Sequence, residues 1–335
     1  MQAVALFGLL LLTLVVFRLP VLPSLQLLYE GALGDKFAVG RTLEKATPLL
    51  FTGLGMVVAW RAGAYNIGGE GQFVIGGLSG AWVAKIALGH VQPSGFLIAI
   101  ILLFSCIGGG LWAGIAGWLQ VKRGVEAVIS TILLNFVALQ ALDWAIRGPL
   151  QQKARELPQT ENLPDAMMLW RPDRQTDLHA GVILALLAAV GIFIYLFRTV
   201  GGYRLRLVGS SPGVARASRI PSDAVTVKAF LLSGALCGLA AGVEYTGAAG
   251  LIGNGFSQNW GFLGIPVALI SGLHPLGAIL GALYFGALLA GSENLGRFTE
   301  SGPTIVYVVQ SAAVLGFIAI GAIKRNAPAP MEAEA

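Results

Sequence analysis

The residues best suited to chemistry lie between Arg61 and Gln72, in the sequence RAGAYNIGGEGQ. Four of these twelve residues are glycine, which permits backbone conformations that interrupt a helix. Asn66, Glu70 and Gln72 supply two amides and a carboxylate between two apolar runs. We expect residues 66–72 to be unwound and to face a polar cavity at membrane depth, where an ionisable side chain is a candidate for function. The alternative is a cytoplasmic loop whose polar groups are hydrated.

Further polar side chains occur in or beside apolar runs. Thr131 and Asn135 are four residues apart and therefore share one face of a predicted helix. Such residues either line a solute path or hydrogen-bond neighbouring helices. Asn259 and Trp260 precede a short apolar run, where an aromatic ring beside an amide suits a sugar or a base and equally an interfacial anchor. All four join the polar residues of the 61–72 stretch as candidates for a solute path.

A catalytic alternative rests on one serine and one histidine. Ser79 lies in GLSG and His274 in HPLGAILG, patterns similar to those of rhomboid intramembrane proteases. A serine activated by a histidine base would be a nucleophile. Short patterns of this kind arise readily by chance in a chain with 46 glycines, and the pair leaves the 61–72 stretch unexplained. We therefore favour a protein that is not an enzyme.

The composition indicates a membrane protein. Of the 335 residues, 56% are hydrophobic and 12% are charged, whereas soluble domains average about 45–50% and about 25%. These values exclude a soluble enzyme, a disordered chain and a nucleic-acid binder. The net charge of +5 is instead expected to mark topology and contact with the lipid bilayer.

Ten apolar runs predict an all-α polytopic protein with about ten transmembrane or half-membrane helices. Three runs (48–60, 73–89 and 261–272) are short of the roughly 20 apolar residues that a spanning helix needs, and they adjoin glycine-rich polar stretches. Such interrupted segments are typical of transport sites. Five runs precede the long 147–178 connection and five follow it, which suggests two inverted five-helix halves within one domain, residues 1–323. The ten runs are 3–20, 48–60, 73–89, 95–118, 125–146, 179–197, 226–247, 261–272, 274–292 and 304–323.

Two polar connections differ in charge. Residues 147–178 hold five basic and five acidic residues, whereas residues 198–228 hold six basic residues against Asp223 alone. The positive-inside rule therefore places 198–228 in the cytoplasm and 147–178 outside. Both termini of a ten-span chain then lie inside, and residues 324–335 are expected to form a disordered cytoplasmic tail.

The chain resembles a known family in four segments that occur in the same order. Residues 64–72, AYNIGGEGQ, are similar to the F-N-I-G-x-E-G-Q signature of permeases in nucleoside and simple-sugar ABC importers. Similar stretches lie at 124–135 (GVEAVISTILLN), 206–220 (RLVGSSPGVARASRI) and 261–291. Glu126 and Ser211 stand where that family usually has Asn, and Arg219 stands where it usually has Gly.

The resemblance implies one permease subunit of an ABC importer in a bacterial inner membrane, working by alternating access. Its partners would be an ABC ATPase, a second permease (identical or homologous) and a periplasmic or lipid-anchored solute-binding protein. The chain has no Walker A motif, because none of its seven lysines follows a glycine. ATP hydrolysis would therefore occur on a partner chain, and we expect no cofactor, no metal and no nucleic acid.

The cytoplasmic connection acquires a role from this resemblance. Pro212 suits the first turn of a helix, and we expect residues 212–218 to form a short helix that docks on the ATPase. The alternative is a basic loop that marks the inner face and contacts anionic lipid. The candidate coupling residues are Arg206, Gly209, Pro212, Ala215, Arg216 and Arg219.

Other transporter classes stay open. A branched-chain amino-acid permease belongs to the same superfamily, but the AYNIGGEGQ segment favours nucleosides or sugars. A secondary transporter would need an ion-coupling group within its spans, and Glu70 is the main candidate.

Overall fold

The computed structural model describes residues 20–88, 94–173 and 175–298, together with residues 8, 11, 14–16, 308 and 311. The helices expected at 3–20 and 304–323 and the tail 324–335 therefore lie almost wholly outside the described residues. The chain divides into two units, residues 40–286 and the remainder. The described part is helical and contains no strand, which confirms the all-α prediction. Among the described residues, six helices are long and apolar enough to cross a membrane, so the protein is a multi-pass membrane protein.

Most of the apolar runs correspond to helices, and two of the three runs expected to be short belong to longer helices. The run 48–60 is only the second half of α3, which has 26 residues. The first half contains charged residues such as Glu44 and Lys45, so it does not form an apolar run in the sequence. The run 73–89 extends back to Gly69 and gives a helix of 20 residues. In order, the helices are α2 (Val21–Leu33), α3 (Lys36–Arg61), α4 (Gly69–Leu88), α5 (Gly95–Arg123), α6 (Ala127–Arg147), η1 (Asp165–Met167), α7 (Gly181–Arg198), α8 (Val200–Ser210), α9 (Pro212–Ala217), α10 (Ser222–Glu244), η2 (Tyr245–Ala249), α11 (Trp260–Ile270) and α12 (Pro275–Phe298).

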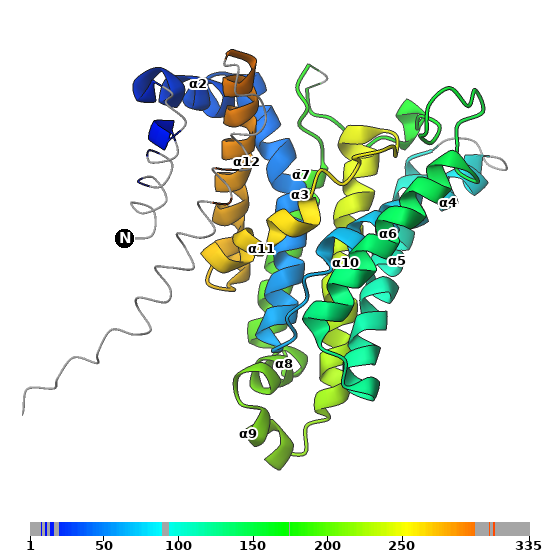
Figure 1. Ribbon diagram of the computed structural model, residues 1–335, viewed down its shortest axis with the longest axis vertical. Coiled ribbons are helices and arrows are strands. Elements are labelled where there is room, and N and C mark those ends of the chain that lie inside the picture. Colours follow the sequence, from blue (N-terminus) through cyan, green and yellow to red (C-terminus); the bar gives the residue numbers. More distant parts are fainter. Residues whose placement is uncertain are drawn as a thin grey trace, which may run out of the picture. The chain divides into compact units, whose positions relative to one another are not determined.

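Helices α4, α5 and α10 form the core of the unit 40–286, and glycines bring their backbones together (Figure 1). A Cβ built on Gly109 of α5 would lie 2.7 Å from the Cα of Gly238 in α10. A Cβ built on Gly76 of α4 would also meet the backbone of Gly238. Small residues allow such approach in membranes, where van der Waals packing replaces the hydrophobic drive between helices. Glycines at these contacts therefore serve the close packing of the three helices.

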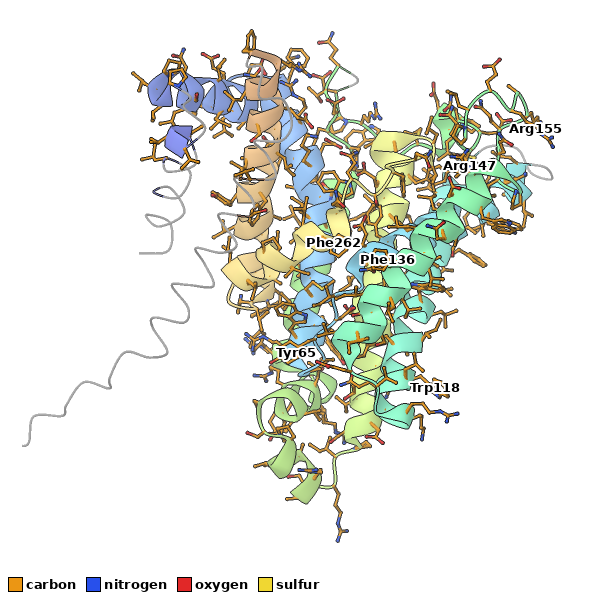
Figure 2. The ribbon with its side chains drawn as sticks, viewed as in Figure 1. Tyr65, Trp118, Phe136, Arg147, Arg155 and Phe262 are labelled. Carbon is orange, nitrogen blue, oxygen red and sulfur yellow. The ribbon has the colours of Figure 1, made fainter. Side chains whose placement is uncertain are left out.

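The two polar connections lie at opposite ends of the unit 40–286. Helices α8 and α9 form one end, and the connection between α6 and α7 lies at the other, where Arg155 is labelled (Figures 1 and 2). This arrangement agrees with the prediction that 147–178 and 198–228 face opposite sides of the membrane.

The connection from Gly148 to Ala180 is attached to the end of α10, where a π-helical turn, η2, follows the α-helix. The Gly250 N–H donates to the Tyr245 carbonyl, five residues earlier, at 3.0 Å. The Thr246 carbonyl accepts from the Leu169 N–H at 2.7 Å, and the Gly247 carbonyl accepts from Arg171 Nη2 at 2.8 Å. The connection is thus folded against the helix end.

His179 is buried beside this turn, close to Gly247. Burial and, second, the positive charge of Arg171 lower the pKa of His179 to about 4. The ring is therefore neutral at neutral pH, and its Nδ1 accepts a hydrogen bond from the Gly181 N–H at 3.1 Å.

The other unit, residues 1–39 and 287–335, has a similar close contact among its described residues. Gly31 of α2 faces the backbone of Gly291 in α12, and Asn294 Nδ2 donates to the Leu27 carbonyl at 2.9 Å. Helix α2 was not among the predicted runs.

The glycine packing predicts a position-dependent cost for one substitution. Gly109→Leu should lower the stability of the protein by about 1–3 kcal/mol, because its side chain would overlap the α10 backbone. Gly191→Leu on α7 is the matched control, because a Cβ there meets nothing within 4 Å. Thermal unfolding in detergent micelles measures both, and equal midpoints for the two variants would contradict the packing argument.

Candidate functional site

The break between α3 and α4 is the centre of the candidate site. Helix α3 ends at Arg61, α4 begins at Gly69, and residues 64–67 have no regular structure. The expected unwinding is thus confirmed for residues 66–68 and wrong for residues 69–72. Those residues form the first turn of α4, because the Gln72 N–H already donates to the Gly68 carbonyl at 3.0 Å.

Asn66 organises the break through its side-chain amide. Its Nδ2 donates to Gln72 Oε1 at 3.0 Å and to Ser233 Oγ of α10 at 2.9 Å. Its Oδ1 accepts from Gln72 Nε2 at 2.9 Å and from the Gly68 N–H at 2.8 Å. The two amides therefore pair reciprocally, and α10 is tied to the break by the serine.

Helix α6 supplies a second set of hydrogen bonds to the same backbone. Asn135 Nδ2 donates to the Ile67 carbonyl at 3.0 Å, and its Oδ1 accepts from the Gly71 N–H at 2.8 Å. Thr131 Oγ1 accepts from the Ile67 N–H at 3.2 Å. The predicted shared face of Thr131 and Asn135 thus exists, and it contacts the interrupted backbone.

Glu70 joins the start of α4 to the start of α11. The Gly261 N–H donates to Glu70 Oε2 at 3.0 Å, and the Ser257 side chain and the Phe262 amide also hydrogen-bond this carboxylate. A helix N-terminus attracts negative charge through its free N–H groups and its dipole. The Glu70 carboxylate is thus paired with backbone amides at the start of α11.

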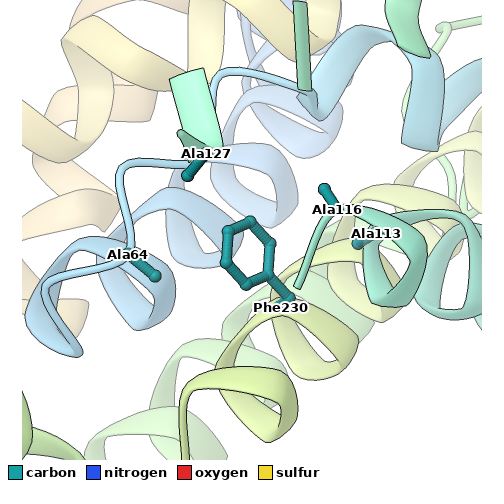
Figure 3. Close-up of a cluster of buried hydrophobic side chains, with 5 residues drawn as sticks. All are labelled: Ala64, Ala113, Ala116, Ala127 and Phe230. Carbon is teal, nitrogen blue, oxygen red and sulfur yellow. The ribbon is translucent and has the colours of Figure 1, made fainter. Parts of the chain in front are cut away.

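Apolar contacts close the inner side of the break. The Phe230 ring of α10 lies among Ala64 of the break, Ala113 and Ala116 of α5 and Ala127 of α6 (Figure 3). Trp60 of α3 also contacts the break, because its Nε1 donates to the Asn66 carbonyl at 3.0 Å. The break is therefore held by side chains from its own helix and from three neighbouring helices.

Six of the seven predicted path residues are buried, and most of them hold the break in place. Asn259 is the exception, because its side chain is exposed. Trp260 is buried but contributes no hydrogen bond to the network, since its Nε1 has no partner among the described residues. The six residues, each at most 2% exposed, are Asn66, Glu70, Gln72, Thr131, Asn135 and Trp260.

Three exposed aromatic side chains border the break, and they were not among the predicted residues. Tyr65 is 58% exposed, Phe136 62% and Phe262 39%. Figure 2 shows them on the 62–68 segment, α6 and α11, the elements that the hydrogen bonds join. Their positions next to Asn66, Asn135 and Gly261 in the sequence were the available signal.

The predicted coupling helix is present as α9, with Pro212 in its first turn. Ala215 is fully buried, whereas Arg216 and Arg219 are exposed. Arg219 has a φ of 54°, in the left-handed region that favours glycine, the residue that the similar motif has at this position. Residues 200–210 also form a helix, α8, which was not predicted.

The serine and the histidine of the catalytic alternative each form a hydrogen bond with a backbone group nearby in the sequence. Ser79 Oγ donates to the Ile75 carbonyl at 2.8 Å, and His274 Nδ1 accepts from the Gly277 N–H at 3.4 Å. Neither is hydrogen-bonded to the other. In the part of the chain that the structure describes, no three His, Cys, Asp or Glu side chains are grouped as metal ligands.

Removing the α6 amide should destabilise the break. Asn135→Leu leaves the Ile67 carbonyl and the Gly71 N–H without partners, at a cost of about 1–3 kcal/mol. Gln140→Leu removes an amide from an exposed position of the same helix and should stay within about 0.5 kcal/mol of the parent protein. Thermal unfolding in micelles tests this difference, and a mild effect of Asn135→Leu would show that the amide is dispensable.

Comparison with known proteins shows the family of this chain. A family model described as the branched-chain amino acid transport system permease component matches residues 39–319. The chain is 30% identical over 309 residues to the glucose ABC transporter permease protein TsgB13 of Haloferax volcanii, covering 89% of this chain and 80% of that protein. It is 32% identical over 297 residues to the guanosine ABC transporter permease protein NupP of Bacillus subtilis, covering 87% and 84%. The nucleoside ABC transporter permease protein NupB of Lactococcus lactis is 30% identical over 312 residues, covering 88% and 82%. The chain therefore belongs to the branched-chain amino acid transport permease family, whose members are membrane permease components and not enzymes.

Proposed function

We propose that this permease subunit forms the path by which an ABC importer moves nucleosides or simple sugars across the bacterial inner membrane. The relatives named for guanosine, nucleosides and glucose support this solute class. One structural observation supports transport above all: two interrupted helices meet, N-terminus to N-terminus, at the Glu70 carboxylate.

The lengths of the elements explain why this meeting point suits a transport site. Helix α11 has 11 residues, about 16 Å at 1.5 Å per residue. The hydrocarbon core is about 30 Å thick, so α11 cannot cross it. Non-helical backbone at membrane depth occurs where protein covers it or where it lines a cavity, and such interrupted helices mark transporter binding sites.

The division between buried and exposed residues suggests their roles. Asn66, Glu70, Gln72, Thr131 and Asn135 keep the interrupted backbone in shape beside the path, and Trp260 is buried at the start of α11. Asn259, with Tyr65, Phe136 and Phe262, faces the solute. Exposed aromatic faces and an amide suit sugar rings and bases, because ring stacking and hydrogen bonding then act on one ligand.

The assembly and the orientation of the subunit follow the pattern of an ABC importer. Residues 1–323 form a single permease domain that pairs with a second permease, and a solute-binding protein delivers solute from outside. Helix α9 docks on a separate ATPase, because this helix lies at the end of the unit 40–286 opposite the 148–180 connection (Figure 1) and carries the exposed Arg216. Both termini and the 324–335 tail are cytoplasmic.

Uptake assays test the energy source. Glu70→Gln removes the charge that faces the α11 N-terminus and should lower the free energy of unfolding of the protein by about 1–2 kcal/mol. Transport of radiolabelled guanosine or glucose should be slower but should still require ATP, measured in proteoliposomes that contain the complete complex. Glu126→Gln, at an exposed position, should transport as the parent does.

The same vesicles are also tested without ATP but with an imposed proton or sodium gradient. Uptake driven by a gradient without ATP, and abolished in Glu70→Gln, would overturn the ABC importer and favour a secondary transporter.

Cysteine labelling tests the orientation. In a chain whose Cys106 and Cys237 are replaced by alanine, Ser218→Cys and Glu156→Cys place single thiols at exposed positions. An impermeant maleimide should label position 156 in intact spheroplasts and label position 218 only after permeabilisation. The reverse pattern would place α9 outside and exclude its docking on a cytoplasmic ATPase.

A further inference from the structure

The cytoplasmic helix α8 contacts the break directly, through backbone. A Cβ built on Gly209, near the end of α8, would lie 2.7 Å from the Gly63 nitrogen and 2.8 Å from the Ala62 carbonyl carbon. Gly63 has a φ of 74°, so the chain turns sharply at this contact. The end of α8 therefore lies against the first residues of the break, two residues before Pro212 begins α9 in the sequence.

The Phe197 ring of α7 strengthens this junction by binding two guanidinium groups. The Cζ atom of Arg206, in α8, lies 4.8 Å from the ring centroid, and the Cζ atom of Arg61, the last residue of α3, lies 5.3 Å from it. Cations within about 6 Å of an aromatic centroid are attracted to the ring. One side chain thus contacts the residue before the break and a residue of the coupling segment.

The same ring also reaches the turn between α11 and α12. Its centroid lies 5.4 Å from that of His274, and Arg61 Nε donates to the Leu273 carbonyl at 2.6 Å. Leu273 has a φ of 58°, so this carbonyl belongs to a tight turn. Phe197 and Arg61 together therefore join α7, α8, the break and the 271–274 turn.

No carboxylate neutralises this pair of cations in the part of the chain that the structure describes. Neither Arg61 nor Arg206 is in an ion pair there, and Arg206 Nε is buried without a hydrogen-bond partner. Two like charges repel each other, and the contacts with one ring oppose that repulsion. Removing the ring should therefore separate Arg61 from Arg206 more readily than removing an ordinary apolar contact would.

The junction between α7 and α8 is itself firm. Thr199 caps α8, because its Oγ1 accepts from the Gly202 N–H at 3.1 Å, and the same hydroxyl donates to the Tyr195 carbonyl at 2.7 Å. Gly202 lies against the backbone of Leu196. Helix α8 is thus held to the end of α7 that carries Phe197.

We propose that Phe197 is a positioning residue for transport, which links the coupling segment α8–α9 to the break by holding Arg206 and Arg61 on one ring. A displacement of α9 by the ATPase then moves Gly209, Arg206 and Arg61 together. Arg61 is covalently continuous with the segment whose Asn66 fixes Gln72 and Ser233. This inference rests on the proposed function, because it assumes that α9 docks on an ATPase.

The test compares two phenylalanines on one face of α7. Phe193 also contacts His274, with centroids 5.7 Å apart, and Phe197, at 5.4 Å, but among the described residues no guanidinium lies over its ring. Phe197→Leu should lower the number of guanosine or glucose molecules transported per ATP hydrolysed by at least about fivefold, the lower end of typical coupling between sites. Phe193→Leu should leave this ratio near that of the parent complex.

A double-mutant cycle separates linkage from general damage. Arg61→Gln and Phe197→Leu should each lower the ratio, and the double variant should be little worse than either, because both remove the same link. Multiplicative losses, or an equal loss in Phe193→Leu, would overturn the role of Phe197. Co-purification of the ATPase with each variant shows whether the complex assembles, and only assembled complexes enter the comparison.

The parent complex distinguishes the two levels of the proposal. If the parent shows no ATP-dependent uptake, the proposed function fails. If the parent transports normally and Phe197→Leu keeps the same ratio, only the role of Phe197 fails.

Discussion

The interrupted backbone between α3 and α4 needs hydrogen-bond partners for its N–H and C=O groups, and the rest of the site depends on this requirement. Residues 62–68 lack helical partners for many of their N–H and C=O groups, and each buried unpaired group costs about 1–3 kcal/mol. Alternate residues of the break, 62, 64, 66 and 68, are buried away from water, so side chains must replace it. Asn66 and Asn135 do so from within the break and from α6, and Ser233 of α10 holds the Asn66 side chain by a further hydrogen bond.

This solution works only if the surrounding helices lie very close to the break, and the glycines allow that. Gly55 of α3 lies against Ser233, since a Cβ there would be 2.8 Å from the Ser233 carbonyl. On α4, a Cβ at Gly71 would lie 2.9 Å from Asn135 Oδ1, and at Gly68 it would lie 2.8 Å from Gln72 Nε2. Larger side chains at these positions would push the partners beyond hydrogen-bonding distance. The glycines of the AYNIGGEGQ segment therefore serve the network as well as the break.

The sequence predicted these features to different degrees, for physical reasons. Local signals sufficed for the interruption near Gly68, for the shortness of α11 and for the helix that begins at Pro212, because each depends on residue type and nearby spacing. The first half of α3 escaped detection because its charged residues resemble a loop. The pairing of Asn66 with Ser233, 167 residues later, leaves no local trace, and the same holds for the Phe197 contacts. A buried polar residue can be recognised from sequence, but its partner depends on packing.

The π-helical turn at the end of α10 has a consequence for how the 148–180 connection tolerates change. It presents the carbonyls of Thr246 and Gly247 to Leu169 and Arg171. Three of these four groups are main-chain atoms, so the attachment depends on the number of residues in the turn, because a π turn contains one residue more than an α turn. Deleting one residue from 245–249 should restore regular α-helix and withdraw both carbonyls together. The segment is therefore constrained in length as well as in identity at Gly247, where a Cβ would lie 2.5 Å from His179 Nδ1.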